Sequence, residues 1–370
     1  MSDEWLARMG LGCVYEPGSP EIARIVANYG AVDAWERLKA GSGPLSHKAR
    51  LLDLPAVVRE GERLKLRFLI PSDEEWPPRL ADLGRCPEVS GRTGEPLGLW
   101  ARGGGRLAEL VADSVALVGS RAATAYGERT AGEIAGDLSN AGYAVVSGGA
   151  FGIDAAAPRG CHAGRTPTVA VLAGGLDSPY PPSNFQLFER VAERGVVVSE
   201  FAPGEHPTRL RFLGRNRLIA ALSQGTVIVE GSVRSGARNT VSWALALGRP
   251  AMAVPGPVNH ANSFTPHQLI REGEAVLVSG MVEVLELLRP KAEPLPRPES
   301  PRRPTDGLSE NQLRVYDALP KSGSRSVTDL SLQLGMRIPD CLATLRQLDE
   351  LGMVRQNMQQ AWQLRREQAA

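Results

Sequence analysis

Short valine-rich apolar runs that alternate with helical segments constrain the fold of this chain more than any other feature of its sequence. Seven such runs occupy residues 115–118, 143–146, 168–172, 196–198, 226–229, 251–254 and 275–278. Helix-forming segments follow several of them, at residues 128–141, 184–193, 216–222 and 240–247. Because strands that are apolar along their whole length are buried on both faces, the alternation predicts a mostly parallel, doubly wound α/β sheet of the Rossmann-like type over residues 107–288.

A proline-rich, charged segment at residues 289–307 divides the chain. Its prolines prevent it from forming a helix or filling a core, so we predict a semi-extended linker there. At the other end, Ser19-Pro20 before Ile22 is a helix-start signal, and a second helix is expected over residues 32–39. We therefore predict a small helical domain over residues 1–70, which residues 71–106 connect to the sheet.

The tail, residues 308–370, has the pattern of a winged helix. Helical segments at 310–319, 326–334 and 339–351 precede two strand-like pieces at 353–355 and 361–364. The third helix would be the recognition helix if it read a major groove. Its basic and polar residues are balanced by acids, which favours a protein-contact or packing role and leaves nucleic-acid binding as the alternative; these residues are Arg337, Arg346 and Gln347 against Asp340, Asp349 and Glu350.

The charge and cysteine content exclude several classes of protein. Lys+Arg at 42 against Asp+Glu at 41 gives a net charge of +1, so a nucleic-acid partner must be held by a local patch. No lysine lies between residues 66 and 290, which excludes a Walker-type loop or a Schiff-base site in the sheet domain. The scattered Cys13, Cys86, Cys161 and Cys341 favour reduced thiols over a disulfide scaffold or a zinc site. Without a signal peptide or a long apolar segment, a cytoplasmic protein with no membrane insertion is expected.

Three loops that follow predicted strands are rich in small residues and meet at one rim of a parallel sheet, where ligands bind in such folds. Their candidate ligand-contacting residues are Gly119, Ser120 and Arg121, then Ser147, Gly148, Gly149 and Gly152, then Gly174, Gly175 and Asn184. Small residues allow an anion to approach a helix N-terminus closely. Ser147 stands where a nicotinamide dinucleotide site needs an acid, which argues against a dehydrogenase.

Residues 209–238 hold six arginines and a single acid, Glu230. An arginine run is usually a solvated face, but at this rim it favours a groove for a phosphate backbone. The candidate DNA contacts in this part of the chain are Arg211, Arg215, Asn216, Arg217, Arg234, Ser235, Gly236, Arg238, Asn239 and Thr240.

No catalytic set of residues is evident in the sequence. The histidines lack acid or cysteine partners at fixed spacing, and there is no G-x-S-x-G elbow. Asp154 and Glu200 are expected to hold arginines or loop backbone, although a pair of catalytic acids is the alternative. We expect no enzymatic activity, no metal and no cofactor.

Seven short motifs in order resemble the DprA/Smf family, the DNA-processing proteins of bacterial natural transformation. The motifs are Val118-Gly119-Ser120-Arg121 with Tyr126-Gly127, Ser147-Gly148 through Gly152-Ile153-Asp154, Gly175-Leu176-Asp177 with Tyr180-Pro181 and Asn184, Ser199-Glu200, Arg215-Asn216-Arg217, Ser235-Gly236 with Thr240, and Pro255-Gly256. Upstream, Ile70-Pro71-Ser72-Asp73 and Leu99-Trp100 are similar to the segment that enters the family's sheet domain.

The resemblance implies a non-enzymatic recombination mediator with a SAM-like N-terminal domain and a winged-helix tail. Such a protein protects incoming single-stranded DNA, forms a homodimer, and loads the RecA recombinase onto strands coated by single-strand-binding protein. It also implies that Arg121, Arg215, Arg217 and the loop at residues 235–240 contact DNA. Leu269 and Ile270 are candidate dimer-interface residues, with core packing as the alternative.

The chain departs from the family pattern at Pro158, Pro182, Thr265 and His267. Two other functions stay open as alternatives. One is a nucleotide-cleaving phosphoribohydrolase on a related fold. Glu230-Gly231-Ser232 is only distantly similar to the glycine-rich loop of those enzymes. The other is a regulator that binds duplex DNA through the winged helix.

Overall fold

The computed structural model describes residues 2–289 and 305–365, and all seven valine-rich runs form strands in it. They are β3 (Ser114–Val118), β4 (Ala144–Ser147), β5 (Val169–Leu172), β6 (Val196–Ser199), β7 (Gly225–Ile228), β8 (Ala251–Ala253) and β9 (Val276–Leu277). Neighbours pair in parallel in the order β6-β5-β4-β3-β7-β8-β9. The predicted doubly wound parallel sheet is confirmed.

Two strands that the alternation does not predict extend the sheet beyond β6. They are β1 (Arg67–Leu69) and β2 (Leu99–Arg102). Strand β2 runs antiparallel to both of its neighbours and places Trp100 opposite Ser199. Both strands are short and stand among loops, so they carry too few residues for a periodic signal.

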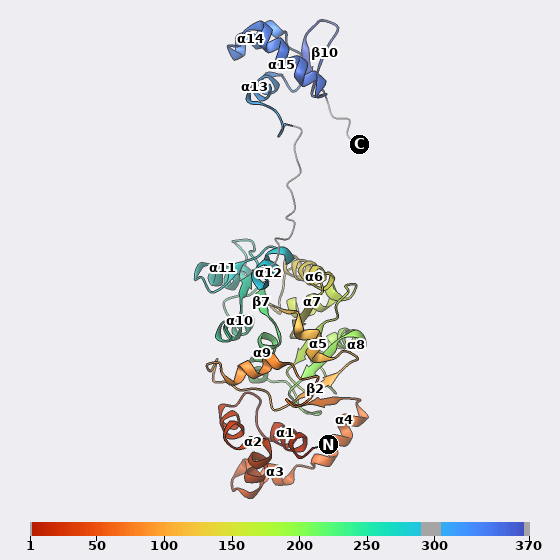
Figure 1. Ribbon diagram of the computed structural model, residues 1–370, viewed down its shortest axis with the longest axis vertical. Coiled ribbons are helices and arrows are strands. Elements are labelled where there is room, and N and C mark those ends of the chain that lie inside the picture. Colours follow the sequence, from red (N-terminus) through yellow and green to blue (C-terminus); the bar gives the residue numbers. More distant parts are fainter. Residues whose placement is uncertain (1, 290–304, 366–370) are drawn as a thin grey trace. The chain divides into compact units, whose positions relative to one another are not determined.

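Helices cover both faces of the sheet because successive strand residues point to opposite sides. In β3, Ala116 and Val118 pack beneath α5 (Leu107–Ala112), α9 (Arg209–Leu222), α10 (Ala237–Ala246) and α11 (Phe264–Arg271). On the opposite side, Val115 and Leu117 face α6 (Ala125–Asn140), α7 (Ile153–Cys161) and α12 (Met281–Leu288). Helix α8 (Phe185–Arg194) lies on this second side through Phe188, which packs against Leu172 (Figure 1).

The N-terminal segment is helical, as predicted. It forms α1 (Asp3–Val14), α2 (Pro20–Ala40), α3 (Pro44–Leu51) and α4 (Leu54–Arg63). Helix α2 is broken at Gly30, whose φ of 76° interrupts it before the predicted second helix begins. Met9 of α1 shares a core with Phe68 and Trp100, so these helices pack directly on strands β1 and β2. Among the described residues, no helix combines the length and the apolar content that crossing a membrane requires.

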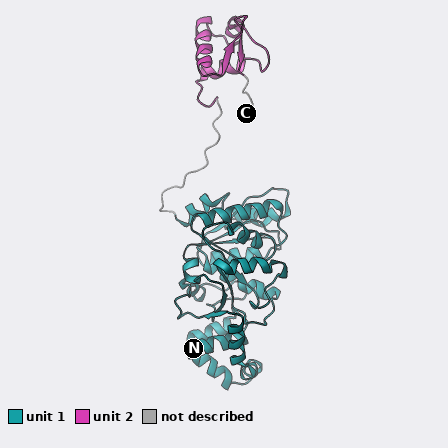
Figure 2. Ribbon diagram, turned by 90° about the vertical axis from the view of Figure 1, so that its right-hand side faces the viewer, with its two compact units in different colours: residues 1–295 teal, residues 296–370 magenta. Residues whose placement is uncertain are grey.

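Two compact units make up the chain, residues 1–295 and residues 296–370 (Figure 2). The second contains α13 (Glu310–Ala318), α14 (Val327–Leu334), α15 (Ile338–Glu350), β10 (Val354–Gln356) and β11 (Trp362–Leu364). Its two strands pair antiparallel, so three helices and a hairpin follow in the order expected for the tail. Of the predicted linker, residues 290–304 lie outside the described residues. The finer division of the first unit at residues 70 and 106 stays a prediction.

Arg249 ties the end of α9 to the loop after α10, and we expect it to be important for stability. Its guanidinium donates to the carbonyl oxygens of Ala220 and Ser223, each at 2.7 Å, and pairs with Asp82 at 2.9 Å. Replacing it with methionine keeps the bulk but leaves these carbonyls unpaired, so the free energy of unfolding should fall by about 2–3 kcal/mol. Urea unfolding followed by tryptophan fluorescence measures this change. The exposed Arg190 is the control, because Arg190→Met should leave the midpoint unchanged.

Candidate nucleic-acid interface

Strands β3 and β7 are neighbours at the point where the order of the sheet reverses. From β3 the chain continues through β4, β5 and β6 on one side, and it returns to β7 before continuing to β8 and β9 on the other. The loops after the two strands therefore separate and leave a crevice, which is where open α/β sheets bind ligands. A cavity of about 750 Å³ occupies this position.

We call this cavity the rim pocket. Its wall is formed by the loop after β3, the start of α7, the segment before α8, the start of α9 and the loop after β7. The residues that line it are Val118, Gly119, Ser120, Arg121, Ala122, Ala150, Asp154, Tyr180, Pro207, Thr208, Arg209, Phe212, Leu213, Arg215, Asn216, Ser232, Arg234, Ser235, Gly236, Ala237 and Thr240. The structure thus brings together nine of the predicted DNA contacts, namely Gly119, Ser120, Arg121, Arg215, Asn216, Arg234, Ser235, Gly236 and Thr240.

Three exposed arginines give the rim pocket its charge. Arg121, Arg209 and Arg234 come from three different segments, and all are exposed. In the part of the chain that the structure describes, no carboxylate forms an ion pair with any of them. Unpaired guanidinium groups are forked donors that suit phosphate oxygens. Gly236 at the N-cap of α10 adds a helix N-terminus with the same preference for anions.

Two aromatic rings lie among these arginines. The guanidinium carbon of Arg121 is 4.2 Å from the ring centroid of Phe212, a cation–π contact. The Tyr180 ring meets Phe212 edge-on, with centroids 5.9 Å apart. Tyr180 is 43% exposed, so its ring is open to solvent at the mouth of the pocket. Exposed rings between cationic side chains are surfaces on which nucleobases stack.

A buried Arg215 and Asp154 form the floor of the rim pocket. Arg215 donates to the carbonyl oxygens of Gly148, at 2.6 Å, and Val171. Burial lowers the pKa of Arg215 to about 10, so it stays charged at neutral pH. Burial also raises the pKa of Asp154, an effect opposed by the charge of Arg215 and by backbone N–H groups of Gly119 and Gly148. The pair fixes the loops after β3 and β4, as the structural interpretation of Asp154 predicts.

The loops of the rim pocket are held by hydrogen bonds from behind. Ser120 N–H donates to the Glu230 carbonyl at 2.8 Å, and the Glu230 carboxylate accepts from the N–H and hydroxyl of Thr124 at 2.9 and 2.6 Å. Thr265, one of the departures from the family pattern, donates its hydroxyl to the Ser232 carbonyl at 2.7 Å. His267, another departure, accepts from Gly256 N–H at 3.3 Å. These hydrogen bonds hold the loops after β3 and β7 in place.

Seven predicted contacts support the rim pocket without lining it. Gly149 and Gly152 have φ angles of 65° and 68°, which glycine adopts most readily, and they shape the turn into α7. Asn184 donates to the carbonyls of Gly149 and Ala150. Ser147 donates its hydroxyl to the Leu117 carbonyl, and Gly148 lies against the side chains of Arg215 and Asp154. Gly174 and Gly175 lie close to the backbone of the segment that follows β6. The predicted glycine loops converge as expected. The first lines the pocket with Gly119, Ser120 and Arg121, whereas the second and third reach it through Ala150 and Tyr180 and not through their predicted contacts.

Four further predicted contacts do not line the rim pocket, and other side chains already bind them. Arg217 is 1% exposed and forms a bidentate ion pair with Glu200, both bonds at 2.6 Å. Arg211 pairs with Glu16 and Glu205, each at 2.7 Å. The remaining two are Arg238, which pairs with Glu272 and Glu274, and Asn239, which bonds Ser90. The burial of Arg217 contradicts its predicted DNA contact, and acids neutralise Arg211 and Arg238.

The candidate dimer residues lie on α11. Leu269 is fully buried in the core of its own chain, and Ile270 is half-buried against the same core. The interface prediction is therefore wrong for Leu269, and the alternative of core packing holds there. For Ile270, which keeps part of its surface exposed, the interface stays a prediction.

Among the lining residues that were not predicted contacts, three carry a charge or an aromatic ring suited to DNA: Arg209, Phe212 and Tyr180. Each carries a signal in the sequence. Arg209 belongs to the arginine cluster, Phe212 lies inside it, and Tyr180 belongs to a family motif. An aromatic residue interleaved with arginines is a feature of single-strand binding sites.

The second unit offers little free positive charge at its third helix. Arg337 pairs with Asp340 at 2.7 Å, and Arg365 of the hairpin pairs with Asp349 at 3.4 Å. Among the described residues, no group of three histidine, cysteine or acidic side chains could hold a metal ion.

Comparisons with known proteins agree with this geometry. The sequence model of the family DNA recombination-mediator protein A matches residues 67–289. A Mycobacterium tuberculosis relative that carries the DprA name is 39% identical over 357 residues, which cover 93% of this chain and 90% of the relative. The crystal structure of DNA processing protein A from Streptococcus pneumoniae superposes with a TM-score of 0.64 at 27% identity, over 77% of this chain and 97% of that one.

A second solved structure, DNA processing protein A from Helicobacter pylori, was described for its single-stranded DNA binding mode. It matches with a TM-score of 0.53 at 24% identity, over 62% of this chain and 98% of that one. At this identity the likeness concerns the fold.

Proposed function

This chain belongs to the DprA/Smf family of DNA recombination mediators, and we propose that it binds single-stranded DNA in the rim pocket. The observation that carries the proposal is the set of three unpaired arginines around the Phe212 and Tyr180 rings. The arginines would bind phosphates, and the rings would stack with bases. Both contacts are independent of base sequence.

Single strands fit the rim pocket better than a duplex does. Bases are hidden inside a duplex, so only an unpaired strand can place a base on the exposed Tyr180 ring. The site also lacks an element free to enter a major groove, since the start of α9 forms the pocket wall through Thr208, Arg209 and Phe212. The description of the Helicobacter pylori relative supports this preference.

We further propose that the bound strand is protected and passed to RecA during natural transformation, in the cytoplasm. Family membership supports this step. A homodimer would place two rim pockets on one strand and raise avidity without new kinds of contact. RecA and single-strand-binding protein are accordingly the proposed protein partners.

The phosphoribohydrolase alternative needs a free acid near the loop after β7. Glu230 is 3% exposed, and both of its carboxylate oxygens accept hydrogen bonds from Thr124. Its carboxylate caps the start of α6 and does not line the rim pocket. This arrangement favours a binding protein with no catalytic role for Glu230.

The proposal is tested by replacing Arg121 and Arg234 together with alanine. We expect the affinity for a fluorescein-labelled oligothymidylate to fall by about 10-fold to 100-fold. A variant that contacts fewer phosphates releases fewer counterions when it binds. The slope of log K against log salt should therefore become shallower by about 0.7 per arginine. Fluorescence anisotropy at several salt concentrations measures both quantities, with an unlabelled duplex as competitor.

The matched control replaces two exposed arginines outside the rim pocket, Arg129 and Arg190, and should bind like the wild type. Equal losses in the two double variants would show that binding depends on overall charge and not on the pocket. Preference for the duplex would favour the winged-helix regulator instead.

A further inference from the structure

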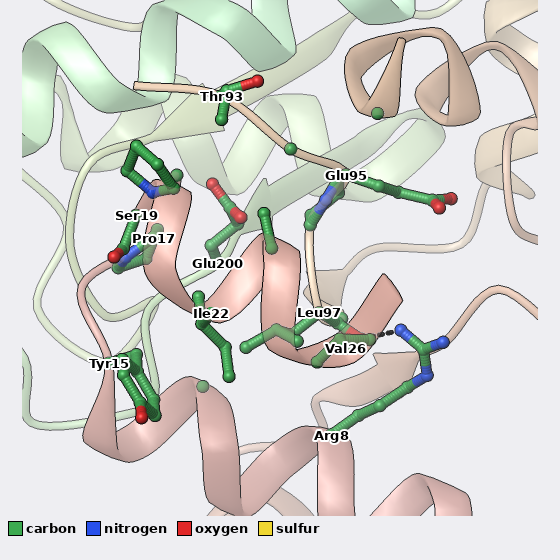
Figure 3. Close-up of a pocket in the computed structure, with 18 of the residues that line it drawn as sticks. Arg8, Tyr15, Pro17, Ser19, Ile22, Val26, Thr93, Glu95, Leu97 and Glu200 are labelled. Atoms are coloured by element: carbon green, nitrogen blue, oxygen red, sulfur yellow. Dashed lines mark hydrogen bonds between the residues drawn. The ribbon is translucent and has the colours of Figure 1, made fainter. Parts of the chain in front are cut away.

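A second cavity lies between the N-terminal helices and the sheet, and its lining is distinct from that of the rim pocket. We call it the bundle cavity. It has a volume of about 470 Å³, within the range of small-molecule sites. Its walls include Met9 and Gly12 of α1, Ile22 and Val26 of α2, Trp100 of β2, and Leu97. Ile22, Val26 and Leu97 point into the same space (Figure 3).

Glycine leaves part of this space unfilled. Gly12 lies inside α1, where glycine costs about 0.5–1 kcal/mol relative to alanine. Apart from its chain neighbours and the backbone of its own helix, no atom of the described residues comes within 4 Å of the position that a Cβ at Gly12 would take. A larger side chain would therefore both improve the helix and fill the cavity. Glycine at this position therefore keeps the cavity open, although helix stability and packing would both favour a larger side chain.

Arg217, which belongs to the cavity wall, has a buried N–H donor without an acceptor among the described residues. Both terminal nitrogens of Arg217 donate to the Glu200 carboxylate at 2.6 Å, whereas its Nε is buried and, within the described residues, has no hydrogen-bond partner. A Cβ at Gly18, which lines the cavity, would lie 3.0 Å from this Nε. An unpaired buried N–H costs roughly 1–3 kcal/mol, so an acceptor atom placed there would be bound favourably.

The charged residues around the cavity are balanced in number. Three arginines and three glutamates line it: Arg8, Arg24, Arg217, Glu88, Glu95 and Glu200. Arg8 pairs with Glu4 at 2.8 Å and donates to the Leu97 carbonyl, and Glu95 accepts from the Trp76 indole at 3.1 Å. Burial raises the pKa of the Cys13 thiol in the wall to about 11, so that group is neutral. With three arginines and three glutamates the lining has no net charge, so it offers a charged ligand no net attraction.

We propose that the bundle cavity binds an uncharged, predominantly apolar small molecule that presents one hydrogen-bond acceptor to the Nε of Arg217. The walls come from α1, α2 and the sheet, so the molecule would hold the N-terminal helices against the sheet. This inference is independent of DNA binding, because it involves a different cavity and a different ligand.

Nile red tests the site, since it is an uncharged apolar dye with a carbonyl acceptor. The full-length protein is titrated with the dye, and fluorescence gives affinity and stoichiometry. We expect one dye per chain, with blue-shifted emission. Pyrene, an apolar molecule without an acceptor, should bind at least tenfold more weakly; equal affinities would overturn the assignment of Arg217 as the polar anchor.

Two cavity-filling variants locate the dye. Gly12→Leu fills the cavity from α1, and Val26→Phe fills it independently from α2, so the test does not depend on one variant folding. Each should weaken Nile red binding at least tenfold, without lowering the melting temperature measured by circular dichroism. Gly12→Ala is the matched control, because one methyl group leaves most of the volume and should change the affinity less than threefold.

Stoichiometric binding by the wild type that both filled variants lose would support the site. Absence of stoichiometric binding, or unchanged affinity in folded Gly12→Leu and Val26→Phe, would overturn it. The outcome is separate from that of the oligothymidylate titration, which reports on the rim pocket alone.

Discussion

Replacing Glu200 with leucine is expected to lower the free energy of unfolding of the first unit by about 3–5 kcal/mol. The substitution leaves Arg217 as a buried charge without its partner. The two side chains are 1% and 5% exposed, so water cannot take the place of the lost carboxylate. Urea denaturation of the full chain, followed by tryptophan fluorescence, gives the change in midpoint and slope.

A double-mutant cycle separates the pair from the packing around it. Arg217→Met alone should also destabilise strongly, because it leaves a buried carboxylate. The combined variant Glu200→Leu with Arg217→Met should recover most of the loss, since replacing both charges removes the desolvation cost along with the attraction. The exposed pair Arg129–Glu133 is the control, with N and O atoms 4.0 Å apart. Strictly additive losses at Glu200 and Arg217 would contradict the interpretation.

Replacing Gly152 with alanine is the second change with a large expected effect. Its φ of 68° and ψ of −126° lie in a region that only glycine occupies readily. A Cβ there would stand 2.2 Å from the Ser120 carbonyl oxygen and 2.8 Å from that of Arg121. Both atoms are backbone of the loop that carries the rim-pocket arginine. We expect a loss of about 3 kcal/mol in stability and at least a tenfold loss in oligothymidylate affinity.

Gly142 provides the matched control for this substitution. It also has a positive φ, 93°, but apart from its two chain neighbours no atom of the described residues lies within 4 Å of its Cβ position. Gly142→Ala should therefore cost only the backbone strain, about 1 kcal/mol, and leave DNA affinity unchanged. If Gly152→Ala behaved like Gly142→Ala, the collision with the Ser120 loop would have no energetic consequence. Thermal unfolding and fluorescence anisotropy on both variants decide this.

The parallel sheet could be predicted because its strands are buried on both faces. Runs such as the one that became β3 must be apolar at every position, and this pattern is visible in the residues themselves. Strands β1 and β2 could not be predicted in the same way. They are three and four residues long, and they are strands because β2 pairs with β6 and β1 pairs with β2. Such a pairing depends on contacts between residues far apart in the chain.

The rim pocket was predictable in its location and only partly in its residues. Loops that follow parallel strands meet at one edge of the sheet, so the sequence alone predicts that Gly119 and Ser120 lie at that edge. The sequence could not show which arginines line the rim pocket and which point away from it. Arg215 and Arg217 are two positions apart on α9, and residues at that spacing point to nearly opposite sides of a helix. One forms the floor of the rim pocket, and the other reaches the bundle cavity.

The sequence by itself therefore determined the sheet, the order of its main strands along the chain, the family, and the edge at which a ligand would bind. These follow from local rules: periodicity, turn-forming residues and short motifs. Only the tertiary structure decided which arginines stay free. Folding places Glu200 against Arg217, Glu16 against Arg211 and Glu274 against Arg238, although these partners are not neighbours in the sequence. Arg121, Arg209 and Arg234 form no ion pair among the described residues, which leaves their guanidinium groups free for the proposed DNA site.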